Sequence, residues 1–410
     1  MLAAVFFTAA SSARAGDQIS TLDHRVSAIP AARLLSAPPA ALVDPARQAG
    51  AQSLARYTRP SWFFWIGMQI LVLLYLWRSG TAARVRDSLK RSLPSLVAVR
   101  FVFGALLALA LQVAALPAEF YHYRILRIIG ISTEAPAGWW SDILLGAAIE
   151  MALVGLAVVV IMWLVDRSHL WWIYVILGVF ATSFFLSFVY PLAVEPLFNR
   201  FTLLPKTTAL AMRIHELSLK AGIGDPPVYI MDISRRSRAG NAFVAGIGPS
   251  KRIVLGDTLL QSATENEIVF MVAHELGHDV RHDTFKGAIF AAWIFIFGAA
   301  LAVLIADRIG FRRDDDPLAR LTLVGALLGC MYVLFLPAIN GYSRTVESAA
   351  DAYALQIDPD HVAGTRLFVR LSDESLSLLC PGRLARIYWY THPPIGTRIS
   401  AINGQPNPCP

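Results

Sequence analysis

The sequence predicts a mainly helical membrane protein with about six transmembrane helices and a small α+β domain inserted between the fourth and the fifth of them. Composition is the first reason: of the 410 residues, 56% are hydrophobic and only 16% are charged, which excludes a disordered chain and an ordinary water-soluble one. The second is a series of apolar stretches, each close to the length that a helix needs to cross a bilayer. The third is a polar segment that interrupts this series after residue 194.

Six apolar stretches lie between charged residues and approach the roughly 20 residues of a spanning helix. They are residues 60–77, 101–118, 143–165, 170–194, 287–306 and 321–343. Trp62, Trp139 and Trp172 lie near their ends, where indole rings anchor at the membrane interface. Because a soluble protein could hardly bury so many long apolar helices, we interpret the chain as a multi-pass protein of the cell (inner) membrane, with the lipid bilayer as its partner.

The net charge of +7 does not indicate nucleic-acid binding, because the basic residues lie among acidic ones or beside apolar stretches, as membrane flanks do. The loop after the second span carries only Arg124 and Arg127. The loop after the first span carries six basic residues, Arg78, Arg84, Arg86, Lys90, Arg91 and Arg100. The positive-inside rule therefore places the first loop in the cytoplasm and residue 195 on the opposite side. The later loops are more balanced in charge, so the side of the inserted domain stays open.

The N-terminal residues are expected to lie outside the fold. Residues 1–15 form a short apolar run followed by small residues, which is typical of a cleaved signal peptide. The missing positive charge at its start leaves a misplaced start codon or an uncleaved anchor as alternatives. Residues 16–59, with Ala, Pro and scattered Arg, are predicted to be an irregular linker. The rest divides into a four-span membrane region, 60–194, and a domain of residues 195–410 that contains the last two spans.

The three cysteines, Cys330, Cys380 and Cys409, share no CxxC spacing and are odd in number. The sequence therefore indicates neither a disulfide framework nor a thiolate metal site. Cysteine usage leaves the redox compartment of the protein open.

The polar segment after residue 194 has the patterns of a small α+β domain. In residues 206–221, apolar and polar side chains follow the period of an amphipathic helix. Residues 228–231 and 252–255 are rich in β-branched residues and are predicted to be short strands. A second helix is predicted over residues 265–279. We expect the chemistry of the protein to lie on this second helix.

His274-Glu275-Leu276-Gly277-His278, an HExxH pattern, lies on that helix. Its spacing puts two imidazoles one turn apart on one helical face, where they can hold a single Zn²⁺. Glu275 falls beside that face and can accept a proton from a metal-activated water and pass it to a leaving amine. The string alone also arises by chance, so a third ligand is needed to support a metal site.

Glu347 is the candidate for the third protein ligand of a catalytic zinc. It follows the sixth apolar stretch in a segment whose alanines favour helix and close packing. Asp351 comes one turn later on the same face and can accept the free N–H of a zinc-bound histidine. Without the HExxH pattern these two carboxylates would be assigned to a solvated helix face, but with it we expect them to belong to a site for one Zn²⁺ per chain.

Several further segments accompany the metal motif. They are EPLFNRF at 195–201, RSR at 236–238, NAF at 241–243, KRIVL at 251–255 and THPP at 391–394. Together with the HELGH and Glu347/Asp351 segments, they resemble the type I CAAX prenyl endopeptidases, integral-membrane zinc metallopeptidases of the gluzincin kind. The resemblance runs from about residue 62 to residue 398.

The resemblance implies a role for each matching residue. The zinc ligands would be His274, His278 and Glu347, with Glu275 as the general acid/base. Asn241, next to an edge strand, would contact the backbone of an extended substrate, which is consistent with β-strand addition. His392 would steady the oxyanion, and Arg398 matches a basic position near the substrate. From the residues alone, Asn241 could instead occupy a turn after Gly240, and His392 could be an ordinary loop histidine.

This sequence also departs from the family. Its eukaryotic members have seven spans and catalytic residues facing the cytosol, whereas this chain has six strong spans and a charge pattern that puts the inserted domain on the other side. We therefore interpret the chain as a membrane-bound, zincin-like zinc metalloendopeptidase that acts on a membrane-associated or unfolded protein or peptide, without assigning CAAX-box processing as its task. The alternatives are a quality-control protease of membrane proteins and, from another class, a noncatalytic membrane scaffold or transporter.

Overall fold

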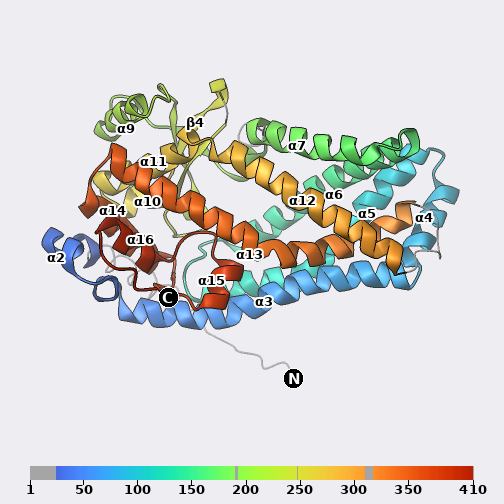
Figure 1. Ribbon diagram of the computed structural model, residues 1–410, viewed down its shortest axis with the longest axis horizontal. Helices are drawn as coiled ribbons and strands as arrows, with labels where there is room; N and C mark the ends of the chain where they lie inside the picture. Colours follow the sequence, from blue (N-terminus) through green and yellow to red (C-terminus); the bar gives the residue numbers. More distant parts are fainter. Residues whose placement is uncertain (1–24, 190–192, 247, 310–316, 410) are drawn as a thin grey trace.

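The structure, a computed structural model, describes residues 25–189, 193–246, 248–309 and 317–409. Long helices run side by side along its longest axis, and the sheet and most of the short helices gather at one end (Figure 1). Five helices in the described residues are long and apolar enough to cross a membrane. They are α3 (Pro45–Arg78), α5 (Leu96–Ile128), α6 (Pro136–Arg167), α12 (Asp283–Arg308) and α13 (Pro317–Ile357).

The fourth predicted span forms α7 (Trp171–Val189), of which residues 171–182 count as a shorter apolar helix. Five of the predicted spans therefore lie on helices that are long and apolar enough to cross a membrane, and the total of six spans stays a prediction. The spanning helices are longer than the apolar stretches, because an apolar stretch marks only the part of a helix that lipid can surround. Helix α13 is the most important case, since it extends beyond its apolar part and carries Glu347 and Asp351.

The expectation of an irregular linker over residues 16–59 is wrong for the residues that the structure describes. Helix α2 (Ala31–Ser36), the 3-10 turn η1 (Pro39–Ala41) and the first turns of α3 lie in this segment, and Leu34 and Leu42 are fully buried in the main hydrophobic core. Their apolar side chains are too scattered along the sequence to show a helical period, but they fill the core beside α14 (His361–Glu374) and α16 (Ile395–Ile402). The predicted signal peptide, residues 1–15, lies outside the described residues.

A four-stranded sheet forms between residues 201 and 256. Its order is β1 (Phe201–Leu203), β2 (Val228–Met231), β4 (Arg252–Gly256) and β3 (Ala242–Ala245), with β2 and β4 parallel and the outer pairs antiparallel. Both predicted strands, β2 and β4, are confirmed, and β4 is buried along its whole length. Strand β1, with only three residues, was not predicted, and β3, two of whose four residues are alanine, was expected only as the edge strand that the family resemblance implies beside Asn241. The arrangement leaves β3 at an edge.

Several shorter helices lie in the same part of the chain as this sheet. They are α8 (Glu195–Phe198), α9 (Ala209–Lys220), α10 (Asp257–Ser262), α11 (Glu265–Val280), α14 (His361–Glu374), α15 (Arg383–Trp389) and α16 (Ile395–Ile402). The predicted helices over 206–221 and 265–279 are thus confirmed as α9 and α11. Helix α11 lies in the middle of the core, where Phe270, Val272 and Leu276 have no exposed surface. Its burial on most sides gives the domain a rigid axis from which its polar residues can project.

A disulfide bond joins Cys380 to Cys409, contrary to the expectation from the cysteine count. The third cysteine, Cys330, is unpaired and exposed on α13. The bond packs on the start of α16 at Gly396. A Cβ atom on this glycine would lie only 3.0 Å from the Cys409 sulfur and 3.2 Å from the Cys380 sulfur. The two cysteines are 29 positions apart in the sequence, so only the tertiary fold brings them together.

Candidate metal centre

Helix α11 presents two histidines on the same side because His274 and His278 are one turn apart. Its first turn is fixed by a capping box, in which the Thr264 amide donates to the Glu267 carboxylate at 2.8 Å and the Glu267 amide donates to the Thr264 hydroxyl. Glu267 is fully buried and also pairs with Arg370 of α14 at 3.0 Å. These contacts fix the start of α11 and hold the helix against α14, and the two histidines follow at fixed turns from that start.

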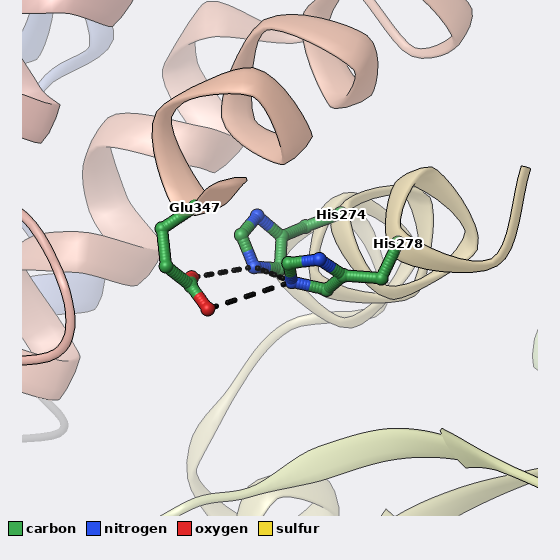
Figure 2. Close-up of side chains that lie close together, drawn as sticks. All are labelled: His274, His278 and Glu347. Atoms are coloured by element: carbon green, nitrogen blue, oxygen red, sulfur yellow. Dashed lines mark hydrogen bonds and ion pairs between the residues drawn. The ribbon is translucent and has the colours of Figure 1, made fainter. Parts of the chain in front are cut away.

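Gly277 lets α11 approach α13 closely. A Cβ atom at this position would lie 3.1 Å from Tyr353 Cδ1 and 3.3 Å from the Cα atom of Ala350, both on α13. The prediction that alanines after the sixth apolar stretch allow close helix packing is therefore confirmed at Ala350. Glu347 lies less than one turn before Ala350, and its side chain points at the histidines (Figure 2).

His274, His278 and Glu347 converge on one small volume (Figure 2). The Nε2 atoms of the two histidines are 3.3 Å apart. The Glu347 carboxylate lies 3.2 Å from His274 Nε2 and 3.6 Å from His278 Nε2. Each residue offers one candidate ligand atom, and these atoms all lie within 4.8 Å of one another. The structure thus brings together the three residues that the sequence predicts as metal ligands.

A carboxylate contacts the outer nitrogen of each histidine. His274 Nδ1 lies 2.9 Å from Asp351 Oδ1, and His278 Nδ1 lies 3.1 Å from Asp283 Oδ2. Sequence reasoning found Asp351 but missed Asp283, which begins α12 five residues after His278. The helix break between α11 and α12 was the available signal, since an acidic first residue of the next helix folds back onto the end of α11.

Arg398 holds Asp351 in place. Its guanidinium donates to both Asp351 oxygens, at 2.8 and 2.6 Å, and lies 3.9 Å from the centre of the Phe368 ring. Arg398 and Asp351 are both buried, at 8% and 7% exposure. A bidentate, buried pair of this kind fixes orientation as well as charge. The sequence predicts a substrate contact for Arg398, whereas the contacts seen here run to Asp351 and through it to His274.

Charges within the cluster shift several pKa values. Burial alone would lower the pKa of His274, but contacts with the Asp351 and Glu347 carboxylates raise that pKa to about 9. Burial opposes ionisation of Asp351, yet the Arg398 guanidinium holds the pKa of this carboxyl well below its usual range. Asp351 therefore remains an anion beside His274 Nδ1. A metal ion at His274 Nε2 would compete with a proton for the same imidazole.

The donor set fits a divalent cation. With both ring protons on Nδ1, where Asp351 and Asp283 lie 2.9 and 3.1 Å away, both Nε2 lone pairs and the Glu347 carboxylate face one volume. Within the described part of the chain, the buried Oε2 atom of Glu347 accepts no hydrogen bond of normal geometry. A cation would relieve the repulsion among these three donors, and two imidazoles with one carboxylate form a ligand set that catalytic zinc accepts.

Glu275 lies beside the three candidate metal ligands in a cavity of about 370 Å³. Burial raises the pKa of its carboxyl above the usual value for glutamate. The same cavity is lined by Asn241, His392 and Arg398, so all predicted site residues that do not ligate the metal, apart from Asp351, border one space. His392 reaches Glu347, with 3.4 Å between His392 Nε2 and Glu347 Oε2.

Asn241 directly precedes the edge strand β3. Its carbonyl oxygen accepts the Gly256 amide at 2.8 Å, so the residue is paired with β4 on one side while its side chain is exposed. In the described residues no strand pairs with the other edge of β3. An extended chain could therefore be added at this edge, next to Glu275.

A second, larger cavity of about 650 Å³ lies between α3, α5 and α6. Glu119 lines it and accepts hydrogen bonds from Trp65 Nε1 at 3.2 Å and Gln112 Nε2 at 2.8 Å. Trp389, from α15, borders both this cavity and the cavity at Glu275. A space among the membrane helices thus adjoins the candidate catalytic space, which the hydropathy pattern alone did not reveal.

Comparison with known proteins assigns the chain to a family. Residues 205–405 match peptidase family M48, and residues 31–200 match the region described as CAAX prenyl protease N-terminal, five membrane helices. A Bacillus subtilis protein named uncharacterized metalloprotease YhfN is 30% identical over 396 residues, which make up 93% of this chain and 91% of that protein. The chain belongs to peptidase family M48.

Other similar proteins carry the name CAAX prenyl protease 1. The Arabidopsis thaliana homolog is 33% identical over 243 residues, 57% of this chain and 56% of its own length, and the probable Schizosaccharomyces pombe enzyme is 28% identical over 399 residues, 89% and 82% of the two lengths. The crystal structure of S. mikatae Ste24p aligns with a TM-score of 0.75 and 24% identity, covering 95% of this chain and 97% of that chain. That match establishes a shared fold.

The resemblance to the CAAX prenyl endopeptidases is therefore confirmed. The protein is a metalloprotease, and thus a hydrolase, and it is a multi-pass membrane protein. The family implies a bound metal, and the His274, His278 and Glu347 cluster is where the described residues could hold it.

Proposed function

We propose that the protein is a membrane-bound zinc endopeptidase, with the ion held by His274, His278 and Glu347. The observation that carries this proposal is the convergence of three ligand atoms within 4.8 Å next to Glu275 in one cavity. The zinc ion, when bound, would polarise the carbonyl of the scissile bond and acidify an attacking water. The residues of the chain supply the remaining steps.

Glu275 is the general base and acid in this proposal. Its carboxylate takes a proton from the attacking water and delivers it to the leaving nitrogen as the peptide bond breaks. A pKa raised by burial suits a group that must both accept and release that proton near neutral pH. Asn241 would hold the substrate backbone along β3, and His392 would donate a hydrogen bond to the oxygen that gains negative charge.

Substrates would enter from the membrane side as unfolded or membrane-associated chains. Support comes from the 650 Å³ cavity among α3, α5 and α6, which shares Trp389 with the cavity at Glu275. Relatives are named CAAX prenyl proteases, so processing of a prenylated C terminus is the second candidate within the same chemistry. A noncatalytic scaffold or transporter is disfavoured, since it would not require Glu275 beside a complete set of ligands.

The substrate class can be tested with the protein purified in detergent. We expect it to cleave an unfolded membrane-associated protein at several extended sites, and we expect no cleavage by Glu275→Gln prepared in parallel. A farnesylated CAAX peptide is the comparison substrate. Cleavage of that peptide alone would favour the processing role, and cleavage of neither substrate would refute the proposed peptidase.

Arg398 is proposed as a positioning residue that acts through Asp351. Arg398→Met should weaken zinc binding by about 10- to 100-fold, which is the usual effect of removing a group that orients a ligand, whereas Arg398→Lys should weaken it less. Zinc affinity, measured by competition with a chelating dye, and kcat and KM at saturating zinc are the readouts. Arg383→Met, on an exposed arginine, serves as the control. A raised KM with unchanged zinc affinity would instead support the substrate contact that the sequence predicts.

A further inference from the structure

Four helix ends meet at the end of the bundle that lies away from the metal centre. A small buried cluster joins Ala82 of α4 (Thr81–Ser92), Phe103 near the start of α5, Met162 near the end of α6 and Leu318 at the start of α13. Figure 1 shows α4 at this end and the sheet domain at the opposite one. The bundle therefore has two distinct ends, and a membrane would place them on different sides.

The loop at the α4 end is the most basic of the short membrane flanks. Residues 78–100 contain six basic residues, against Arg124 and Arg127 in the next loop and Arg47, Arg56 and Arg59 in residues 40–59, directly before the first span. Helix α4 packs its apolar residues Val85 and Leu89 against the bundle. Because basic residues in short loops are retained in the cytoplasm, while long domains cross the membrane largely regardless of charge, this distribution places the α4 end in the cytoplasm.

The disulfide bond is an independent observation at the other end. Cys380 and Cys409 lie on either side of the segment that carries His392 and Arg398, and Cys409 is buried at 4% exposure. The bond therefore belongs to the domain that carries the metal cluster. Structural disulfides form and persist outside the cytosol, where thiols are not kept reduced.

We infer that the candidate catalytic cavity opens on the oxidising, non-cytoplasmic side of the membrane, so its substrates are exported or membrane-inserted proteins exposed on that side. The orientation follows from the loop charges and the disulfide alone. The substrate class rests in addition on the proposed peptidase function. A prenylated cytosolic protein would then lie on the wrong side of the membrane.

The orientation is tested by cysteine labelling in intact cells of a bacterial host. Thr207→Cys, just before α9, and Ser92→Cys, at the end of α4, each place a thiol at an exposed position in a Cys330→Ala background. A membrane-impermeant maleimide should label Thr207→Cys at least tenfold more than Ser92→Cys, and permeabilised cells should label both equally. Preferential labelling of Ser92→Cys would overturn the inference, and so would free Cys380 and Cys409 thiols trapped by rapid alkylation of the same cells.

The substrate class is tested with an unfolded reporter fused to a single-span anchor, made in two versions that expose it on opposite sides of the membrane. Wild type should remove the exported reporter and spare the cytoplasmic one, while Glu275→Gln should spare both. Loss of the cytoplasmic reporter alone would overturn the inference. If both reporters stay intact in cells that carry the wild-type protein, the peptidase function is refuted, and with it the substrate class. The labelling result would still decide the orientation.

Discussion

Glu275→Gln is expected to abolish peptide-bond cleavage while leaving the metal in place. The amide cannot accept a proton from the attacking water, and loss of a general base typically costs about 10²- to 10⁴-fold in rate. The substitution leaves the size of the side chain and all three candidate ligands unchanged. We therefore expect kcat on an unfolded protein to fall by about 10²- to 10⁴-fold, with zinc content equal to that of wild type.

Glu216→Gln is the matched control for this prediction. Glu216 lies on α9 with an exposed side chain, so the same chemical change there should alter neither cleavage nor zinc content. Substantial activity in Glu275→Gln would remove Glu275 from the catalytic step. Loss of zinc from that variant would assign Glu275 a place among the ligands instead.

Glu347→Ala is expected to release the metal. Removing the only carboxylate among the three candidate ligands leaves two imidazoles, and even groups that merely orient a ligand contribute about 10- to 100-fold to affinity. We expect the zinc dissociation constant to rise by more than about 100-fold and cleavage to disappear at stoichiometric zinc. Competition with a chelating dye measures the first effect, and a discontinuous cleavage assay measures the second.

The helix that carries Glu347 should survive the change, because its packing against α11 depends on Gly277 and Ala350. Circular dichroism of the variant should therefore match that of wild type. Glu216→Ala provides the control for loss of a carboxylate elsewhere. Unchanged zinc affinity in Glu347→Ala would show that the third ligand has been wrongly assigned.

Local patterns allowed the candidate metal ligands to be predicted from the sequence. His274 and His278 are related by the period of a single helix, and the length of β2 and β4 follows from short β-branched runs. Glu347 required one further step, the prediction that an alanine-rich helix after the sixth apolar stretch would pack on α11. The histidine spacing and the two strands depend on neighbours within a few residues, and a sequence shows such local patterns most directly.

Contacts between distant residues could not be predicted in this way. Arg398 pairs with Asp351 across 47 residues, and the two cysteines of the disulfide are 29 residues apart. Leu34 joins a core formed mainly by residues after 200, which is why the N-terminal segment was mistaken for a linker. Each of these contacts depends on how whole helices pack, and composition and periodicity do not specify that packing.

Removal and return of the metal tests the central claim most directly, namely that the cluster on α11 and α13 holds a catalytic zinc. Wild-type protein would be stripped with a chelator, dialysed, and assayed for cleavage of an unfolded protein before and after one equivalent of Zn²⁺ is added. We predict about one zinc per chain before stripping, loss of cleavage without it and recovery at one equivalent, with no recovery in Glu347→Ala. Full cleavage by the metal-free protein would contradict the claim.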